Sequence, residues 1–232
     1  MAVSVDTVYQ RVLALANKEQ RGYITPQEFN LFANQAQMDI FEQYFFDINQ
    51  FNRPPGNSTE YSDITTMLNE KISLFKRHIN PNIFNGYFPI PDDLYRLGTV
   101  HFGFAGLEDK IEVTEVNYNE IPYLNSSPLI KPTRFRPIFA KREEGLKVLP
   151  TDITSGITLT YIRKPHGVNW GYVVLNDKAL YNANTSTDFD LHPAEETELV
   201  FKILTFCGIP LGGELYQVGA TEDQRNINQE KQ

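Results

Sequence analysis

The chain has 232 residues, a formal net charge of −8 and 41 % hydrophobic residues, among them sixteen Phe and twelve Tyr. This apolar content excludes wholesale disorder, the negative charge excludes a general nucleic-acid binder, and the lone Cys207 excludes a disulfide framework. Because the sequence has neither the pattern of a signal peptide nor an apolar stretch of membrane-spanning length, we expect a soluble protein made in a cytoplasm.

Two helices are predicted at the start of the chain. The first is indicated by apolar residues at helical spacing, namely Val5, Val8, Val12 and Leu15. The second is predicted from Pro26 to about Ile48, with one apolar stripe made of Phe29, Phe32, Ala33, Ala36 and Ile40. It continues into FEQYFFDINQF, whose additional aromatic residues predict burial on more than one side.

The loop Asn17–Glu28 between these helices has the Gly and Glu spacing of an EF-hand calcium loop. Arg21, however, would place a cation where calcium needs a ligand oxygen. A helix–turn–helix accounts for the residues better. In it, Gly22 ends the first helix, Thr25 is the N-cap of the second, and Glu28 completes a capping box. We predict no metal and no cofactor.

A third helix and then a region of strands are predicted next. Ser62 or Thr59 is the expected N-cap of the helix, which ends by HINPNIFNG and whose apolar residues are Ile64, Met67, Leu68, Ile72 and Phe75. From Tyr87 to about Val174, prolines are frequent and apolar residues alternate. The segments YRLGTVHFGF, KIEVTEV, LKVLP and ITLTYIRKP predict short strands, which favour a small antiparallel sandwich or barrel.

A last helix is predicted over Ala194–Phe206, ended by Gly208. Its apolar residues Leu199, Val200, Ile203 and Leu204 need partners, which the first three helices supply. We therefore predict an α+β fold in which a four-helix bundle, three N-terminal helices plus one C-terminal helix, carries an inserted antiparallel β-sandwich or barrel. The predicted boundaries are 1–80 for the first helices, 81–186 for the β-domain, 187–212 for the last helix and 213–232 for a polar interaction tail.

Catalytic and metal-binding patterns are weak in this sequence. Asp188 and Asp190 form a D-x-D pair, which we interpret as structural because it precedes a helix, where anions are favoured. Cys207, between Phe206 and apolar neighbours, is interpreted as a buried structural thiol. The four His residues lack metal-ligand spacing, and no phosphate-binding loop, nucleophile elbow or dinucleotide fingerprint is present, so a non-enzyme is predicted.

One basic segment, Lys131–Lys147, contains six cations and two anions. It is interpreted either as a patch that faces DNA or an acidic partner, or as a solvated sheet face on which Arg and Lys stems cover apolar surface. The candidate partner-binding residues are Lys131, Arg134 and Arg136 in this segment, and Tyr216, Val218, Arg225 and Ile227 in and before the polar tail.

The opening stretch VYQRVLALANKEQRGYITPQEFNLFANQAQMDIFEQYF resembles virion structural proteins of tailed phages, crAss-like and marine phages among them. Four later stretches, FPIPDDLYRLGTV, PTRFRPIF, LTYIRKP and DFDLHPAEETELVFKILTFCGI, resemble in this order the β-region and closing helix of head-to-tail connector proteins of short-tailed phages, of the adaptor or tail-tubular-A type. The resemblance covers most of the chain through loose patterns.

This resemblance implies a ring, expected to be dodecameric, that is docked under the portal protein, contacts adjacent tail or ring proteins and lets the genome pass. It implies location in the virion, assembly in the bacterial host cytoplasm, no membrane partner and no catalytic residues. Two other classes remain open at this point: another virion component, such as a tail-fibre attachment or minor head protein, and a wall hydrolase packaged in the virion.

Overall fold

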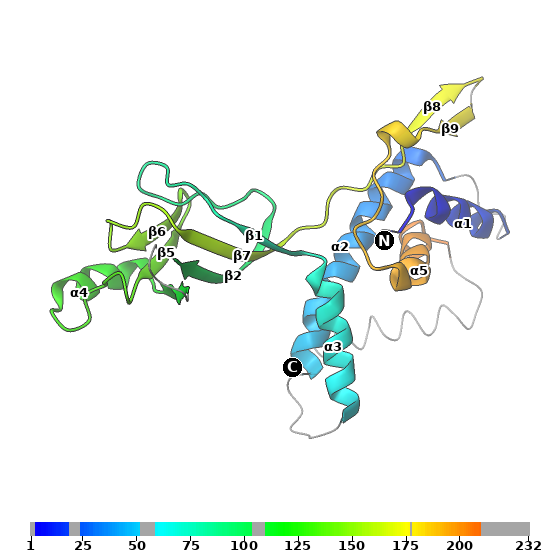
Figure 1. The fold of residues 1–232 in the computed structure, drawn as a ribbon. Helices are drawn as coiled ribbons and strands as arrows, with labels where there is room; N and C mark the ends of the chain where they lie inside the picture. The colour runs from blue at the N-terminus through cyan, green and yellow to red at the C-terminus, as the bar shows by residue number, and fades with distance from the viewer. Residues whose placement is uncertain (1–2, 19–23, 52–58, 104–109, 177, 210–232) are drawn as a thin grey trace. The chain divides into compact units, whose positions relative to one another are not determined.

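The computed structural model describes residues 3–18, 24–51, 59–103, 110–176 and 178–209. Within these ranges the chain is mixed α+β, with five α-helices and several β-sheets (Figure 1). It divides into two compact units: a helical unit, which combines the residues up to Leu74 with those from Pro165 on, and a β unit, Phe75–Lys164. The sequence-based boundaries of the inserted region, 81 and 186, differ from these, mainly at the C-terminal side.

The helical unit contains α1 (Val5–Lys18), α2 (Pro26–Phe51), α3 (Thr59–Ser73) and α5 (Glu196–Phe206). Helix α5 packs against α1 and α2, and α2 also packs against α3. The buried apolar residues of α1, α2 and α5 follow helical spacing, and they include Val5, Val8, Val12, Phe29, Ala33, Ala36, Ile40, Phe41, Leu199 and Ile203. The predicted apolar face of α5 therefore forms core, as do those of α1 and α2 apart from the half-buried Leu15 and Phe32.

The predicted capping box at the start of α2 is confirmed. The Thr25 backbone N–H donates to Glu28 Oε2 over 3.0 Å, and the Glu28 N–H donates to Thr25 Oγ1 over 3.3 Å. These two bonds satisfy backbone donors that have no partner inside the helix. The bond from the Thr25 N–H, followed by the bond of 2.7 Å that the Thr25 hydroxyl donates to Glu28 Oε2, also lowers the pKa of the exposed Glu28 carboxyl, because both bonds favour its charged form. The rest of the predicted turn, including Gly22, lies outside the described residues.

The predictions for α3 and α5 need small corrections. Met67 was expected in the core of α3, but its side chain is 59 % exposed, whereas Leu68 and Ile72 are buried. The last helix begins two residues later than predicted, because a short 3-10 turn, Pro193–Glu195, precedes α5. Gly208 does follow its end, with a φ of +69° that suits glycine, and its N–H donates to the Thr205 carbonyl over 3.0 Å.

The described residues of the β unit form two sheets. One has the strand order β1-β7-β2-β3, all antiparallel pairs, and is made of β1 (Lys76–Ile79), β7 (Ile157–Arg163), β2 (Leu94–Phe102) and β3 (Ile111–Glu112). The other has the order β4-β5-β6, with β4 (Thr114–Glu115) parallel to β5 (Ile138–Arg142) and β5 antiparallel to β6 (Gly145–Leu149). No closed barrel forms among the described residues.

The two sheets of the β unit share one hydrophobic core. It consists of the buried residues Phe88, Val100, Phe102, Val113, Phe139, Leu146, Val148, Ile153, Ile157 and Leu159. Strand β7 alternates buried and half-buried residues along its full length, as predicted for ITLTYIR. The segment KIEVTEV was expected to be one strand, but it changes sheets at the buried Val113 and so forms both β3 and β4.

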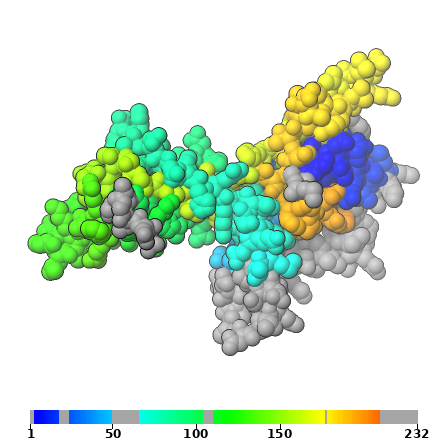
Figure 2. All heavy atoms as spheres, viewed as in Figure 1, coloured from blue at the N-terminus to red at the C-terminus, as the bar shows by residue number. Residues whose placement is uncertain are grey.

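Three elements were missed in the sequence. Helix α4 (Ile121–Ser126) lies in the β unit, and strand β1 follows α3 although all four of its residues are exposed. The third is a β-hairpin of β8 (Tyr172–Leu175) and β9 (Lys178–Tyr181), which belongs to the helical unit. Figure 2 shows this hairpin in yellow as an arm that stands out from the blue α1 and the orange α5.

Candidate functional site

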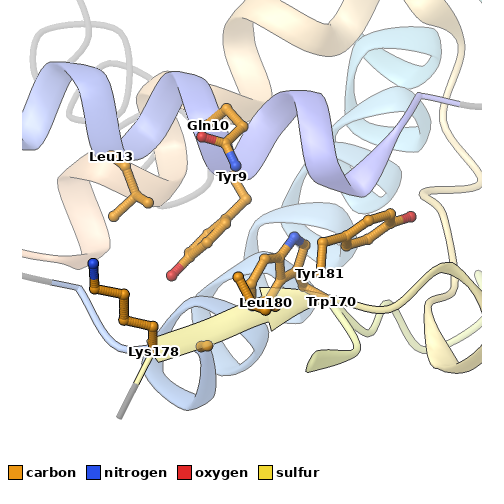
Figure 3. A pocket seen from close by; sticks show the side chains of 8 residues that line it. Tyr9, Gln10, Leu13, Trp170, Lys178, Leu180 and Tyr181 are labelled. Carbon is orange, nitrogen blue, oxygen red and sulfur yellow. The ribbon is translucent and has the colours of Figure 1, made fainter. Parts of the chain in front are cut away.

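An aromatic cleft, here named the α1–β9 cleft, lies between α1 and the hairpin strand β9 (Figure 3). Its volume is about 430 Å³, and it is lined by Tyr9, Gln10, Leu13 and Trp170 together with the four residues of β9. In Figure 3 the side chains of Tyr9 and Leu13 point from α1 toward β9, and Trp170 lies beside Tyr181. A concave site with this lining can hold apolar or aromatic groups.

Trp170 anchors the cleft. Its side chain is only 2 % exposed and packs against Tyr9, with the ring centroids 4.2 Å apart. Its indole Nε1 donates to Asp6 Oδ1 over 3.0 Å, which satisfies the polar atom of the buried ring. On the hairpin side, the Trp170 ring lies 5.9 Å from Tyr172 and 5.8 Å from Tyr181. The base of the hairpin is therefore attached to α1 through one aromatic cluster.

A ladder of side-chain amides on α2 positions Trp170. Asn30 accepts from the Trp170 N–H over 2.7 Å and donates to the Trp170 carbonyl over 3.3 Å. Asn34 makes the same two bonds to Val168, each of 2.8 Å. Gln37 donates to the His166 carbonyl over 2.7 Å. We name these three α2 residues the amide ladder.

The amide ladder works because two structural periods match. Four residues along a helix rise about 6 Å, and two residues along an extended chain rise about 6.6 Å. Asn30 and Asn34, one helical turn apart, therefore reach Trp170 and Val168, two residues apart in the extended chain. Among the described residues no strand pairs with this segment on the side of α2, and the amides of α2 take that place. The sequence signal is an Asn, Asn, Gln stripe on α2, which matches no catalytic or metal-binding motif.

The β8–β9 hairpin exposes apolar side chains. Its paired residues are Tyr172 with Tyr181, Val173 with Leu180, Val174 with Ala179, and Leu175 with Lys178. Val173, Val174, Leu175 and Leu180 are between 50 % and 60 % exposed. Because side chains alternate along a strand, Val174 lies on one face and the other three on the opposite face. Exposed apolar groups on both faces indicate an interaction surface.

A buried charged cluster lies elsewhere in the helical unit. The ammonium of Lys71 on α3 forms an ion pair with the Glu195 carboxylate, which is 6 % exposed, and lies 5.4 Å from the centre of the Tyr44 ring. Burial, followed by the charges of Glu195 and Glu198, raises the pKa of Tyr44. Burial is also the main reason that the pKa values of Asp47 and Glu198 are raised.

Shifted pKa values of buried groups occur in active sites and also in structural ion pairs. Here the cluster joins α2, α3 and the start of α5, so its ion pair connects helices that are far apart in the sequence. Among the described residues, no three His, Cys, Asp or Glu side chains lie close enough to hold a metal ion. We interpret the cluster as a structural connection.

The basic segment is partly neutralised within the β unit. Arg134 donates to Asp152 over 2.7 Å, and Lys141 pairs with Glu115 at 2.9 Å. The Arg142 guanidinium lies 3.7 Å from the centre of the Tyr118 ring. Lys131 and Arg136 are exposed, and the Arg136 backbone forms a turn with Thr133. The structure therefore spreads these cations over separate local contacts, while the other predicted partner-binding residues, Tyr216, Val218, Arg225 and Ile227, lie outside the described residues.

The D-x-D pair has a structural use. Asp188 Oδ1 accepts from the Val5 N–H over 2.9 Å at the start of α1, and Asp190 Oδ2 accepts from the His166 N–H over 2.7 Å. Phe189 between them is fully buried. The sequence predicted that these acids favour the helix that follows them, but Asp188 caps the N-terminus of α1. Cys207 is half-buried rather than buried, and this burial raises its pKa to about 11.

Comparison with protein-family models gave no match, and comparison with curated protein sequences gave none either. Among the described residues, no helix combines the length and the hydrophobicity that a membrane span requires.

Proposed function

We propose that the chain is a structural protein of a phage virion that forms a ring of the head-to-tail connector between portal and tail. The ring lines the channel through which the genome is ejected, and the protein has no catalytic activity. The proposed architecture is a four-helix bundle with an inserted β-sandwich, whose described strand pairs are antiparallel except for β4 with β5. The helical unit with its interrupting β unit, and the shared core of the two sheets, support this arrangement.

The observation that carries the proposal is the exposed apolar arm. Monomeric proteins rarely expose several neighbouring apolar residues, and larger exposed patches mark interaction sites. The β8–β9 hairpin exposes four such residues next to an aromatic cleft. In the β unit, the segment around α4 also exposes apolar side chains, with Leu129 90 % and Tyr123 76 % exposed. A subunit with an apolar surface on each unit suits an assembly with several neighbours.

The charge of the chain fits a channel wall. A net charge of −8 repels phosphate, which allows DNA to pass without being retained. Two exposed cations of the basic segment, Arg134 and Lys141, form ion pairs with nearby carboxylates. This pairing reduces their attraction for a passing DNA duplex. The proposed ring therefore guides DNA instead of binding it.

Reconstitution with the portal protein tests this function. The purified chain is mixed with portal from the same phage, and the mixture is analysed by sedimentation and by negative-stain images. The proposal predicts a complex in which a ring of the chain caps one end of the portal. Absence of any complex at micromolar concentrations, together with binding to tail fibres or hydrolysis of cell-wall polymer, would contradict it.

A further inference from the structure

The two strands of the hairpin differ in what lies beside them. The hairpin is a two-stranded sheet, so among the described residues neither outer edge is paired with another strand. The outer edge of β9 borders the α1–β9 cleft, because all four β9 residues line it. An isolated hairpin of this size is marginally stable in water, and further strands stabilise it. Both edges are therefore available for strand addition.

The direction of the free backbone groups follows from the turn. Only two residues separate Leu175 from Lys178, and Asn176 has a φ of +50°, as a tight hairpin turn requires. In such a hairpin the flanking pair exchanges hydrogen bonds, so the next pair, Val174 and Ala179, points its backbone N–H groups outward. Each edge thus offers a free donor at a known position: Val174 on β8 and Ala179 on β9.

We propose that β8 of one copy of this chain adds to the β9 edge of a second copy, so that its apolar side chains cover the α1–β9 cleft. This inference rests on the ring assembly of the proposed function. The chain carries both parts of the contact, an apolar strand with a free edge and an aromatic cleft beside another free edge. The hairpin forms one wall of its own cleft, so its β8 cannot pair with its own β9 from that side.

The contact joins different surfaces of the two copies. An interface that pairs two different surfaces repeats head to tail, and it closes into a ring when the rotation between copies permits. Pairing of β8 with β8, or of β9 with β9, would instead give a symmetric dimer. The contact buries exposed apolar residues on one face of the hairpin and the half-buried Leu13 of α1.

Blocked-edge variants test the contact and its direction. Val174→Pro removes the outward donor of β8, and Ala179→Pro removes that of β9, at edge positions where proline is tolerated. Sedimentation velocity of the full-length chain is expected to give a large assembly, and each variant alone is expected to give the 26.6 kDa monomer. An equimolar mixture of the two variants keeps one intact contact and is expected to give a 1:1 dimer.

Leu175→Lys is a second variant that leaves the backbone unchanged, and it is expected to weaken assembly at least tenfold. Leu31→Lys is its control, an exposed leucine on α2 that belongs neither to the hairpin nor to the lining of the α1–β9 cleft, and is expected to assemble like the wild type. Fluorescence of Trp170, the only tryptophan, reports whether the hairpin base is folded in each variant.

A monomeric wild type, normal assembly of a folded blocked-edge variant, or dimers formed by one such variant alone would each overturn the inference. So would a mixture that stays monomeric. These outcomes can be distinguished from failure of the proposed function. If the chain binds portal and the hairpin variants assemble like the wild type, only the contact between β8 and β9 is rejected. If assembly depends on the hairpin but the chain does not bind portal, only the connector function is rejected.

Discussion

Asn34 on α2 binds the backbone of Val168 through two hydrogen bonds of 2.8 Å, one to the carbonyl oxygen and one from the N–H. Val168 is 3 % exposed, so water cannot readily replace these bonds. Asn34→Ala leaves both backbone groups without their partner and is expected to lower the free energy of unfolding by roughly 2 kcal/mol. Urea unfolding measures this, and Gln35→Ala, an exposed neighbour on the same helix, is the control with an expected change below about 0.5 kcal/mol. Equal effects of the two variants would contradict the role of the amide ladder.

The capping box of α2 gives a second prediction. Thr25→Ala removes the acceptor for the Glu28 N–H and is expected to destabilise the protein by about 1 kcal/mol, the usual effect of a lost N-cap. Thermal melting checks it, with Gln27→Ala in the same first turn as control. A melting temperature equal to that of the wild type would show that the box contributes nothing.

The capping box and the amide ladder also show what the sequence could and could not predict. Thr25 and Glu28 are three residues apart, so their geometry is local and a motif identifies it. The bonds from Asn34 to Val168 span 134 positions, and no local pattern predicts such a pairing. Strand β7 was predicted because its alternating residues face a core, whereas β6 was predicted from a short apolar run that is buried at four of its five positions. The hairpin was missed because YVVLNDKALY exposes apolar residues on both faces, which hides the usual alternation.

The ion pair between Lys71 and Glu195 gives a third prediction. Lys71→Met leaves the buried Glu195 carboxylate without its cation and is expected to cost about 3 kcal/mol, because breaking one side of a buried pair is more costly than replacing both. The double variant Lys71→Met/Glu195→Leu is expected to be more stable than Lys71→Met alone. Denaturant unfolding of the wild type, the two single variants and the double variant measures the coupling free energy between the two side chains, and additive effects would exclude such a coupling.

Glu198 gives a prediction about pH. Its pKa is raised in the folded chain, first by burial and then by the Glu195 charge, so ionising Glu198 as the pH increases destabilises the fold. Glu198→Gln is therefore expected to increase the free energy of unfolding at pH 7. This difference in the free energy of unfolding should disappear below the ordinary pKa of a glutamate, where Glu198 is protonated in both the folded and the unfolded chain. A variant that is less stable than the wild type at pH 7 would show that the charged form is favoured.

The polar tail gives a fifth prediction, which concerns residues outside those described. Residues 219–232 include ten of the D, E, K, R, N and Q kinds and one large apolar side chain, Ile227, so they contribute little to a core. A chain truncated after Val218 is expected to melt like the full-length protein but to fail to enter virions. Entry at normal occupancy would show that the tail has no assembly role, and loss of folding would show that it belongs to the core.

Cryo-electron microscopy of the neck of purified virions tests the central claim most directly. The account predicts a ring between portal and tail whose subunits match the helical unit and the β unit of this chain, with DNA or an open channel along the axis. The account would be contradicted if the neck lacked this chain and the density of the chain were found at a tail fibre or inside the head.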